Sequence, residues 1–184
     1  MKFKTLVLSD LFRYSGSKNY KAFLKYFFNS RSFRFIFFYR AVTNYSNKHV
    51  FGIIARLWYR NLTTKLGYQV PKSVKIGKGF MLIHFGHLII NSKAVLGDNC
   101  NIYPGVTIGA TFRGESKGVP KIGNRVWIGT NAVIVGNLTI GDNVLIAPNA
   151  YVNTNIPSDS IVFGNPAIIK RRIDATESYI TNVS

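Results

Sequence analysis

Residues 121–152, KIGNRVWIGTNAVIVGNLTIGDNVLIAPNAYV, carry an aliphatic side chain at every sixth position. These positions are Ile122, Ile128, Ile134, Ile140, Ile146 and Val152. A period of six matches neither the roughly 3.6-residue repeat of an α-helix nor the two-residue alternation of a long strand. It is typical of a β-solenoid, in which each six-residue unit forms one short strand and one corner, and the stacked coils bury a column of aliphatic side chains.

The same repeat occurs upstream in a second register. Its aliphatic positions are Ile90, Leu96, Ile102 and Ile108. A small or aliphatic residue often stands two positions earlier, as at Ala132 and Ala150, and can also face a narrow interior. Glycine and asparagine occur at the expected corners, for example in Gly141-Asp142-Asn143, where they tolerate a positive φ. We therefore predict a mainly β protein with a solenoid over residues 69–172.

Two interruptions mark candidate functional regions of this solenoid. Near His84, the step from one aliphatic position to the next, Leu82 to Ile90, is eight residues instead of six, so two extra residues bulge from the corner. The second interruption is the loop 109–121, which is too long and too rich in glycine for a regular coil. Sites are commonly built where irregular loops leave a rigid scaffold, so we expect functional residues in both segments.

The first 68 residues differ in composition from the rest of the chain. They hold thirteen of the 24 Lys and Arg residues, a single acid, Asp10, and eighteen aromatic residues. Apolar residues at helical spacing predict helices over residues 20–28, 33–45 and 49–66. Two interpretations remain open: a helical cap that packs on the solenoid or on another subunit, and a basic, aromatic helix lying on an anionic membrane surface. Nucleic acid is not an expected partner, because no RNP, zinc or helix-turn-helix motif is visible.

Other features exclude several classes of protein. The most apolar run, residues 35–39, is far shorter than the roughly 20 residues of a membrane span, and no signal peptide is recognisable. The single cysteine, Cys100, excludes a disulfide framework and favours a reducing compartment. It stands at an inward position of the repeat, where we expect it to fill the core. The C-terminal tail, residues 173–184, is polar, and we expect residues 174–184 to fray.

The motifs along residues 67–172 resemble those of the hexapeptide-repeat acyltransferases, and within them the serine acetyltransferase branch. The resemblance rests on Lys75-Ile76-Gly77-Lys78-Gly79, Leu82-Ile83-His84, Val106-Thr107-Ile108-Gly109, Val119-Pro120-Lys121-Ile122-Gly123 and Gly164-Asn165-Pro166-Ala167. It implies that the solenoid is a left-handed parallel β-helix. It also implies a homotrimer with sites between subunits, and acetyl-CoA as the acetyl donor, with no metal.

By this resemblance, His84 falls on the family's catalytic histidine. An alcohol that attacks a thioester must lose its proton, and a neutral imidazole can accept that proton near physiological pH. His87 stands where the family has a small residue; it either lines the acceptor pocket or lies on the surface. Gln69, His87 and Arg113 are the candidates for binding the acceptor.

The resemblance also implies a binding site for acetyl-CoA. The candidate residues are Ala110, Thr111, Thr130, Pro148, Lys170 and Arg171. Thr130 follows an Ile-Gly pair near the pantetheine, and Pro148 lies one coil further on, where its missing N–H removes one expected hydrogen bond. The basic cluster 170–172 is positioned to meet the CoA phosphates, with a solvated basic tail as the alternative.

The acceptor side departs from the pattern of the serine enzymes. Gln69 stands at the position of an aspartate that supports the histidine, and Gly118-Val119 replaces an Arg-His pair that meets the carboxylate of serine. We therefore expect that free L-serine is not the preferred acceptor. The basic, aromatic segment 1–68 instead resembles that of bacterial acetyltransferases acting on capsule, exopolysaccharide or O-antigen sugars.

The resulting hypothesis is an acetyl-CoA-dependent O-acetyltransferase acting on a sugar hydroxyl of a bacterial surface polysaccharide or its precursor, free or lipid-linked. It places the protein in the bacterial cytoplasm, or peripherally at the inner face of the cytoplasmic membrane through residues 1–68. Serine O-acetyltransferase is one alternative, and a non-catalytic or metal-dependent solenoid trimer is another. The metal-dependent form would need a histidine triad, whereas the solenoid carries only His84 and His87.

Overall fold

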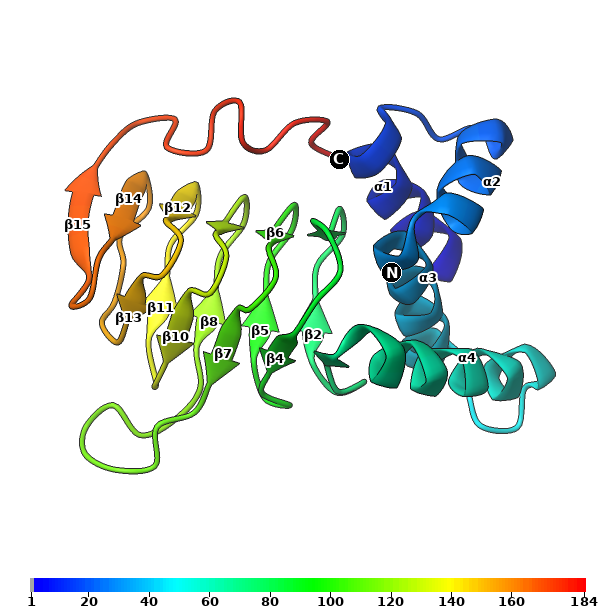
Figure 1. Cartoon of the computed structure of the whole chain (residues 1–184), viewed down its shortest axis with the longest axis horizontal. Coiled ribbons are helices and arrows are strands. Elements are labelled where there is room, and N and C mark those ends of the chain that lie inside the picture. The colour runs from blue at the N-terminus through cyan, green and yellow to red at the C-terminus, as the bar shows by residue number, and fades with distance from the viewer. Residues whose placement is uncertain (1) are drawn as a thin grey trace.

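The computed structural model describes residues 2–184, and this range forms four α-helices followed by fifteen short strands (Figure 1). The helices are α1 (Phe3–Ser15), α2 (Tyr20–Asn29), α3 (Arg31–Asn44) and α4 (Val50–Leu66). The strands are β1 (Tyr68–Gln69), β2 (Lys75–Ile76), β3 (Met81–Leu82), β4 (Leu88–Ile90), β5 (Val95–Leu96), β6 (Asn101–Ile102), β7 (Thr107–Gly109), β8 (Lys121–Ile122), β9 (Trp127–Ile128), β10 (Val133–Val135), β11 (Thr139–Ile140), β12 (Val144–Ile146), β13 (Tyr151–Val152), β14 (Ser160–Phe163) and β15 (Ile168–Arg171).

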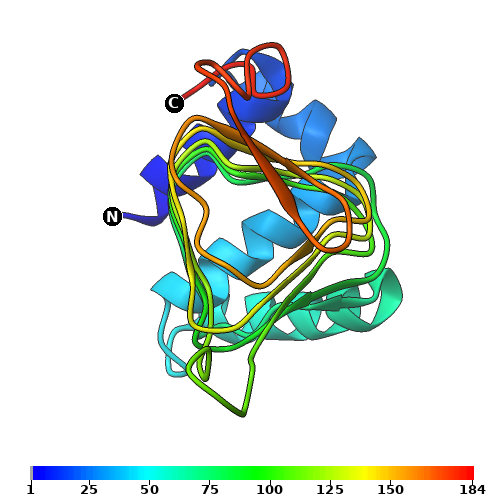
Figure 2. The same cartoon turned by 90° about the vertical axis from the view of Figure 1, so that its left-hand side faces the viewer.

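The strands stack into three sheets that form the sides of a triangular coil (Figure 2). The A-face contains β1-β4-β7-β10-β13, the B-face β2-β5-β8-β11, and the C-face β3-β6-β9-β12-β14-β15. All pairings between successive coils are parallel, and Ile90 pairs with Ile108, three repeats away. One coil therefore consists of three six-residue repeats, and the predicted left-handed parallel β-helix behind a helical segment is confirmed.

The aliphatic residues of the repeat form the core of the coil. Ile128, Ile134 and Ile140 are completely buried, and so are the small residues two positions before the aliphatic ones, such as Ala132. Corner residues adopt left-handed backbone, for example Asn143 with φ 54°. Asparagine tolerates this conformation better than other non-glycine residues, which explains its recurrence at the corners.

Helices α1 and α3 cover the open end of the first coil. The Tyr14 hydroxyl donates to the Leu82 carbonyl at 2.9 Å and accepts from the Leu82 N–H at 3.0 Å. This single side chain therefore satisfies both backbone groups at the exposed edge of β3, an edge that would otherwise be free to pair with another chain. The interpretation of residues 1–68 as a cap on the solenoid is confirmed for these two helices, and we call this helical segment the cap.

A buried ion pair fastens the cap to the first coil. Asp10 in α1 accepts hydrogen bonds from Arg40 in α3 at 2.8 and 3.1 Å, and from the Phe80 N–H of the first coil at 2.8 Å. Arg40 in turn donates to the carbonyl of Ile76 at 2.7 Å. Both charged side chains are buried, so the only acid of the cap lies inside the protein.

Residues 174–184 contradict the expectation that the tail frays. They run back from β15 across the C-face to α1 (Figure 1). Ala175 and Ile180 are buried in one cluster with Trp127 and Leu145, two outward-facing residues of the C-face strands. The polar composition of the tail hid this packing, because two well-spaced apolar residues are enough to cover the apolar side chains of the face. We call residues 174–184 the strap.

Candidate active site

The bulged corner between β3 and β4 presents His84 to solvent. His84 adopts left-handed backbone with φ 60°, and its side chain is exposed. Its carbonyl oxygen accepts hydrogen bonds from the hydroxyls of Ser32 at 2.8 Å and Tyr68 at 3.0 Å. The corner is thus held through the main chain, and the imidazole itself remains available. The expected irregularity at this corner is confirmed, whereas the catalytic role of His84 remains a prediction.

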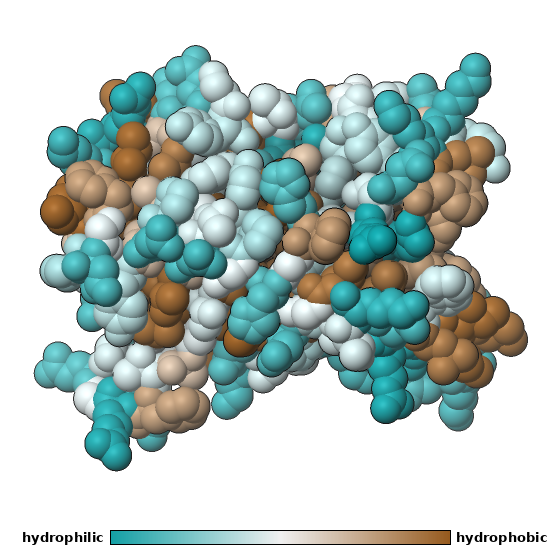
Figure 3. Space-filling view, viewed as in Figure 1, coloured by the Kyte–Doolittle hydropathy of each residue, from teal (hydrophilic) through white to brown (hydrophobic). Residues whose placement is uncertain are grey.

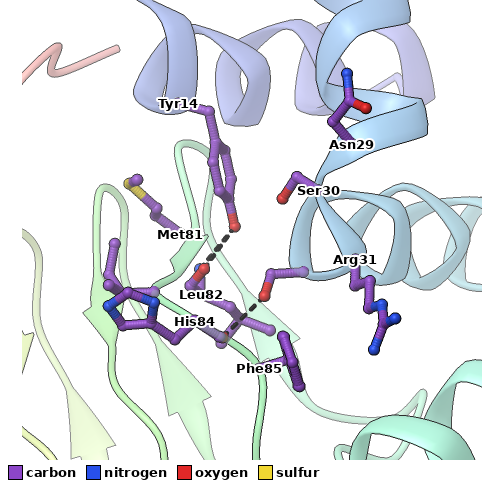
Figure 4. A pocket seen from close by; sticks show the side chains of 10 residues that line it. Tyr14, Asn29, Ser30, Arg31, Met81, Leu82, His84 and Phe85 are labelled. Carbon is purple, nitrogen blue, oxygen red and sulfur yellow. Dashed lines mark hydrogen bonds between the residues drawn. The ribbon is translucent and has the colours of Figure 1, made fainter.

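A pocket of about 450 Å³ lies between this corner and the cap (Figure 4). It is lined by Tyr14, Asn29, Ser30, Arg31, Ser32, Met81, Leu82, Ile83, His84 and Phe85. Arg31 and His84 lie on opposite sides of the pocket, with Phe85 between them. The Arg31 guanidinium lies 5.0 Å from the centre of the Phe85 ring, a distance typical of a cation–π contact.

Half of the residues that line this pocket belong to the cap and were not predicted from the sequence. Tyr14 and Arg31 belong to the cap, and no motif in residues 1–68 marks them as part of a site on the solenoid. Arg31 begins α3, whose N-cap Ser30 accepts a hydrogen bond from the Phe33 N–H at 3.2 Å. A capping serine followed by an amphipathic run is the only local signal, and it predicts a helix start without revealing what that start contacts.

Two buried phenols support the corner as neutral groups. Burial raises the pKa of Tyr14 well above its usual value, although its hydrogen bond to Leu82 opposes the shift. Burial also raises the pKa of Tyr68, and the hydrogen bond with Ser32 opposes that shift. Both hydroxyls therefore remain protonated near neutral pH, where they act as hydrogen-bond donors and not as bases.

Thr130 and Pro148 lie on the same corner of the coil as His84. The strand register pairs Leu82 with Ile102, Ile102 with Ile128, and Ile128 with Ile146. The residue two positions beyond each paired strand residue therefore occupies the corner between the C-face and the A-face. Within residues 2–184, the N–H of Thr130 has no hydrogen-bond partner, so this half-exposed corner offers one free backbone donor.

The loop 109–121 leaves the coil at a different corner, between the A-face and the B-face (Figure 2). Thr111 and Gly118 exchange two backbone hydrogen bonds of 3.0 Å, which close the loop into a hairpin-like projection. Ala110 and Thr111 lie at its base, and Arg113 is exposed near its tip. One chain therefore does not bring these residues together with His84.

The remaining candidates are also dispersed. Gln69 is exposed on β1, the A-face strand next to the cap, and His87 is exposed beside the bulged corner. Lys170 and Arg171 are exposed on β15, at the end of the solenoid far from the cap (Figure 1). The Arg171 guanidinium donates to the Ser158 carbonyl at 2.6 Å. Their roles remain predictions.

Cys100 behaves as a core residue, as expected. It is completely buried, and burial raises the pKa of its thiol to about 12. A thiol held so far from ionisation is a poor nucleophile and a poor metal ligand. Among residues 2–184, no three His, Cys, Asp or Glu side chains are grouped so that they could hold a metal ion. Over the same residues, no helix has both the length and the apolar character required to cross a bilayer.

Comparisons with known proteins give consistent matches. The sequence family described as bacterial transferase hexapeptide (six repeats) matches residues 120–154. A serine acetyltransferase from Helicobacter pylori is 34% identical over 121 residues, covering 66% of this chain and 71% of that protein. One from Synechococcus elongatus is 34% identical over 114 residues, covering 62% of this chain and 47% of that protein. The crystal structure of Neisseria gonorrhoeae serine acetyltransferase in complex with serine has a TM-score of 0.71 and 28% identity, covering 90% of this chain and 68% of that one.

These relatives overturn the expected acceptor. They are serine acetyltransferases, so the hypothesis of a polysaccharide O-acetyltransferase with a glycan acceptor, and with it the rejection of L-serine, is wrong. That hypothesis rested on Gln69, on the character of segment 1–68 and on the absence of a cation at Gly118-Val119. A cation nevertheless lines the pocket beside His84, because the cap contributes Arg31.

The extent of the match varies between relatives. The chain spans 47% of the Synechococcus protein and 71% of the Helicobacter protein. The family model matches the repeats within residues 120–154, and the fold agrees with the Neisseria structure over 90% of this chain. The protein therefore belongs to the hexapeptide-repeat acyltransferase family, in which its relatives are serine acetyltransferases.

Proposed function

We propose that the protein transfers the acetyl group of acetyl-CoA to the hydroxyl of L-serine. The observation that carries this proposal is the exposed imidazole of His84, which stands in the family's histidine motif on a corner fixed by Ser32 and Tyr68. The similarity of the chain to serine acetyltransferases supports serine as the acceptor.

His84 acts as the general base in this proposal. The serine oxygen forms a bond to the thioester carbonyl carbon, the carbon–sulfur bond breaks, and the hydroxyl proton passes to the imidazole. The imidazolium then returns this proton to the leaving thiolate, which leaves as the free thiol of CoA. The neutral Tyr14 and Tyr68 cannot replace His84 as the base, because burial holds their pKa values above the usual range.

The candidate residues for acetyl-CoA, on the His84 corner and elsewhere on the solenoid, have chemistry that suits this donor, which supplies the activated acetyl group when bound. The free N–H of Thr130 is available to an amide carbonyl of the pantetheine. The N–H of Ala110 also has no hydrogen-bond partner within residues 2–184. Pro148 offers no such donor, and Lys170 and Arg171 supply exposed cations for the phosphates.

A thiol-release assay tests the proposed function. The full chain, acetyl-CoA and L-serine should release CoA faster than the same mixture without serine, and O-acetylserine should accumulate in equal amount. An acceptor-independent rate that serine does not raise would contradict the proposal.

We expect Arg31→Gln to raise the KM for L-serine by roughly tenfold or more, because a hydrogen bond to a charged group typically contributes about 1.5–3 kcal/mol. Arg31 is the cation that lines the pocket with His84, and the carboxylate of serine needs such a partner. L-Serinamide, which lacks the carboxylate, should show no comparable change. Arg34→Gln is the matched control, because Arg34 belongs to the same helix but not to this pocket. Equal effects on both acceptors would exclude a carboxylate contact.

We also expect a homotrimer. His84 and the loop 109–121 occupy different corners of one chain, so a site that uses both needs a second copy. Light scattering should give about three times the 20.7 kDa mass of the chain. A monomer at the concentration of the activity assay would contradict this expectation.

A further inference from the structure

Helix α4 presents an apolar stripe that the fold leaves uncovered. One side of the helix packs on the protein through Gly52, Ala55, Leu62 and Leu66. The other side exposes Val50, Ile53, Ile54, Leu57 and Trp58, with exposed fractions of 71, 48, 47, 67 and 48%. These five residues, here called the α4 stripe, follow the spacing of one helix face. Figure 3 shows hydrophobic side chains gathered at the lower right, where α4 begins.

The cap that carries the α4 stripe exposes charges of only one sign. Of the thirteen Lys and Arg residues of the cap, only Arg13 and Arg40 are buried. The single acid, Asp10, is inside the protein and bound to Arg40. The surface formed by residues 2–68 therefore carries nine exposed and two half-buried cationic side chains and no carboxylate.

A pocket beside the α4 stripe also combines cationic side chains with an aromatic wall. It has a volume of about 350 Å³ and lies between α3 and α4. Arg31, Arg34 and Lys65 supply cations to it, so Arg31 lines both this pocket and the one beside His84. Asn61 supplies an amide, and Trp58 supplies an aromatic wall shared with the stripe. This combination suits a phosphate group whose apolar continuation lies along the helix.

The solenoid does not need the α4 stripe for its own stability, because α1, α3 and the Tyr14 hydroxyl already cover the open edge of the first coil. A second cap is a poor partner for the stripe, because each of the two surfaces carries nine exposed cations and neither offers an opposing carboxylate. An anionic bilayer complements both properties at once, since it accepts apolar side chains at its interface and attracts cations around them.

We propose that the α4 stripe docks the protein on an anionic lipid surface, with α4 lying in the plane of the interface. Docking of this kind buries the stripe among the lipid headgroups and acyl chains and places Arg34 and Lys65 at the level of the phosphates. The proposal does not depend on the acceptor of the acetyl group, and it assigns the membrane contact to one helix of the basic, aromatic segment.

The test uses the full chain and vesicle flotation near physiological ionic strength, where long-range attraction between exposed charges is screened. Vesicles of phosphatidylcholine with about one third phosphatidylglycerol should carry the protein upward, and vesicles of pure phosphatidylcholine should carry much less. The variant Ile53→Asp with Leu57→Asp should lose at least tenfold in binding to the anionic vesicles. Ile173→Asp is the matched control, because Ile173 is 81% exposed on the far side of the solenoid and should bind as the unmodified chain does.

Tryptophan fluorescence gives a second measurement that needs no stripe variant. Trp58 is 48% exposed and Trp127 is 8% exposed, so a blue shift on adding anionic vesicles should disappear in Trp58→Phe. Absence of flotation, or undiminished binding by the double variant, would overturn the proposal. A change of oligomeric mass in the double variant, together with no vesicle-induced shift in the unmodified chain, would also overturn it and assign the stripe to contacts between copies.

Discussion

Replacing His84 by alanine is expected to lower the rate of acetyl transfer by roughly 10²–10⁴-fold, the usual contribution of a general base. The thermal unfolding transition should shift little, because the exposed ring makes only an edge contact with the half-buried Tyr103 ring and the corner is held through the His84 carbonyl. The loss should fall on kcat, with little change in the KM for acetyl-CoA. Steady-state kinetics on the purified variant provide the measurement.

His84→Asn separates the loss of the base from any change in the backbone. Asparagine tolerates the left-handed conformation that His84 adopts, with φ 60°, but cannot accept the proton. Both variants should therefore lose the same activity. If His84 served only to hold the backbone conformation of the corner, the His84→Asn variant would stay active. That result would show that His84 is not the general base.

Replacing Asp10 by asparagine is expected to destabilise the protein by about 3–5 kcal/mol, because it leaves the charge of Arg40 buried without its partner. Asp10 is completely buried, Arg40 is 2% exposed, and their closest contact is 2.8 Å. The cap should detach from the first coil more readily, since the Phe80 N–H also loses a charged acceptor. Urea denaturation, analysed for both the midpoint and the slope, measures this change.

The double variant Asp10→Leu with Arg40→Met should recover part of that loss, because removing both charges avoids the unpaired one. Recovery should be incomplete, since the Ile76 carbonyl loses the hydrogen bond from Arg40. Arg171→Ala is the control, because Arg171 is exposed and its loss should change stability by about 0.5 kcal/mol or less. An Asp10→Asn variant as stable as this control would refute the assigned role of the ion pair.

The sequence predicts the solenoid well because the six-residue period determines where each side chain points. Ile128 and Ile134 must face inward for the coils to stack, and no distant contact is needed to infer it. The bulge at His84 is equally local, since two residues too many cannot fit between Leu82 and Ile90. Helix α1 was not predicted, because its N-cap Lys2 makes no side-chain cap and no acid lies in its first turn.

The candidate site is only partly predictable, because half of it is formed by tertiary packing. Arg31 reaches the His84 pocket only because α3 packs across the first coil. The loop lacks a cation at Gly118-Val119, and nothing in the loop indicates that another part of the fold supplies one. The error about the acceptor follows from treating a site built from two regions as if the loop alone determined it.

The strap affects the cooperativity with which the solenoid unfolds. A stack of coils that touch only their neighbours can unravel gradually from either end. Here Arg13 in α1 donates to Thr181 in the strap and to Asn101 in the C-face, and the Ser184 N–H donates to Asn99 at 3.0 Å. Because the strap starts at the last coil and ends at the cap, the two ends of the stack hold each other in place. Neither the cap nor the last coil can unfold alone while the strap stays bound to both. Thermal unfolding of the solenoid should therefore occur in a single cooperative transition, as expected for a chain whose two ends are linked.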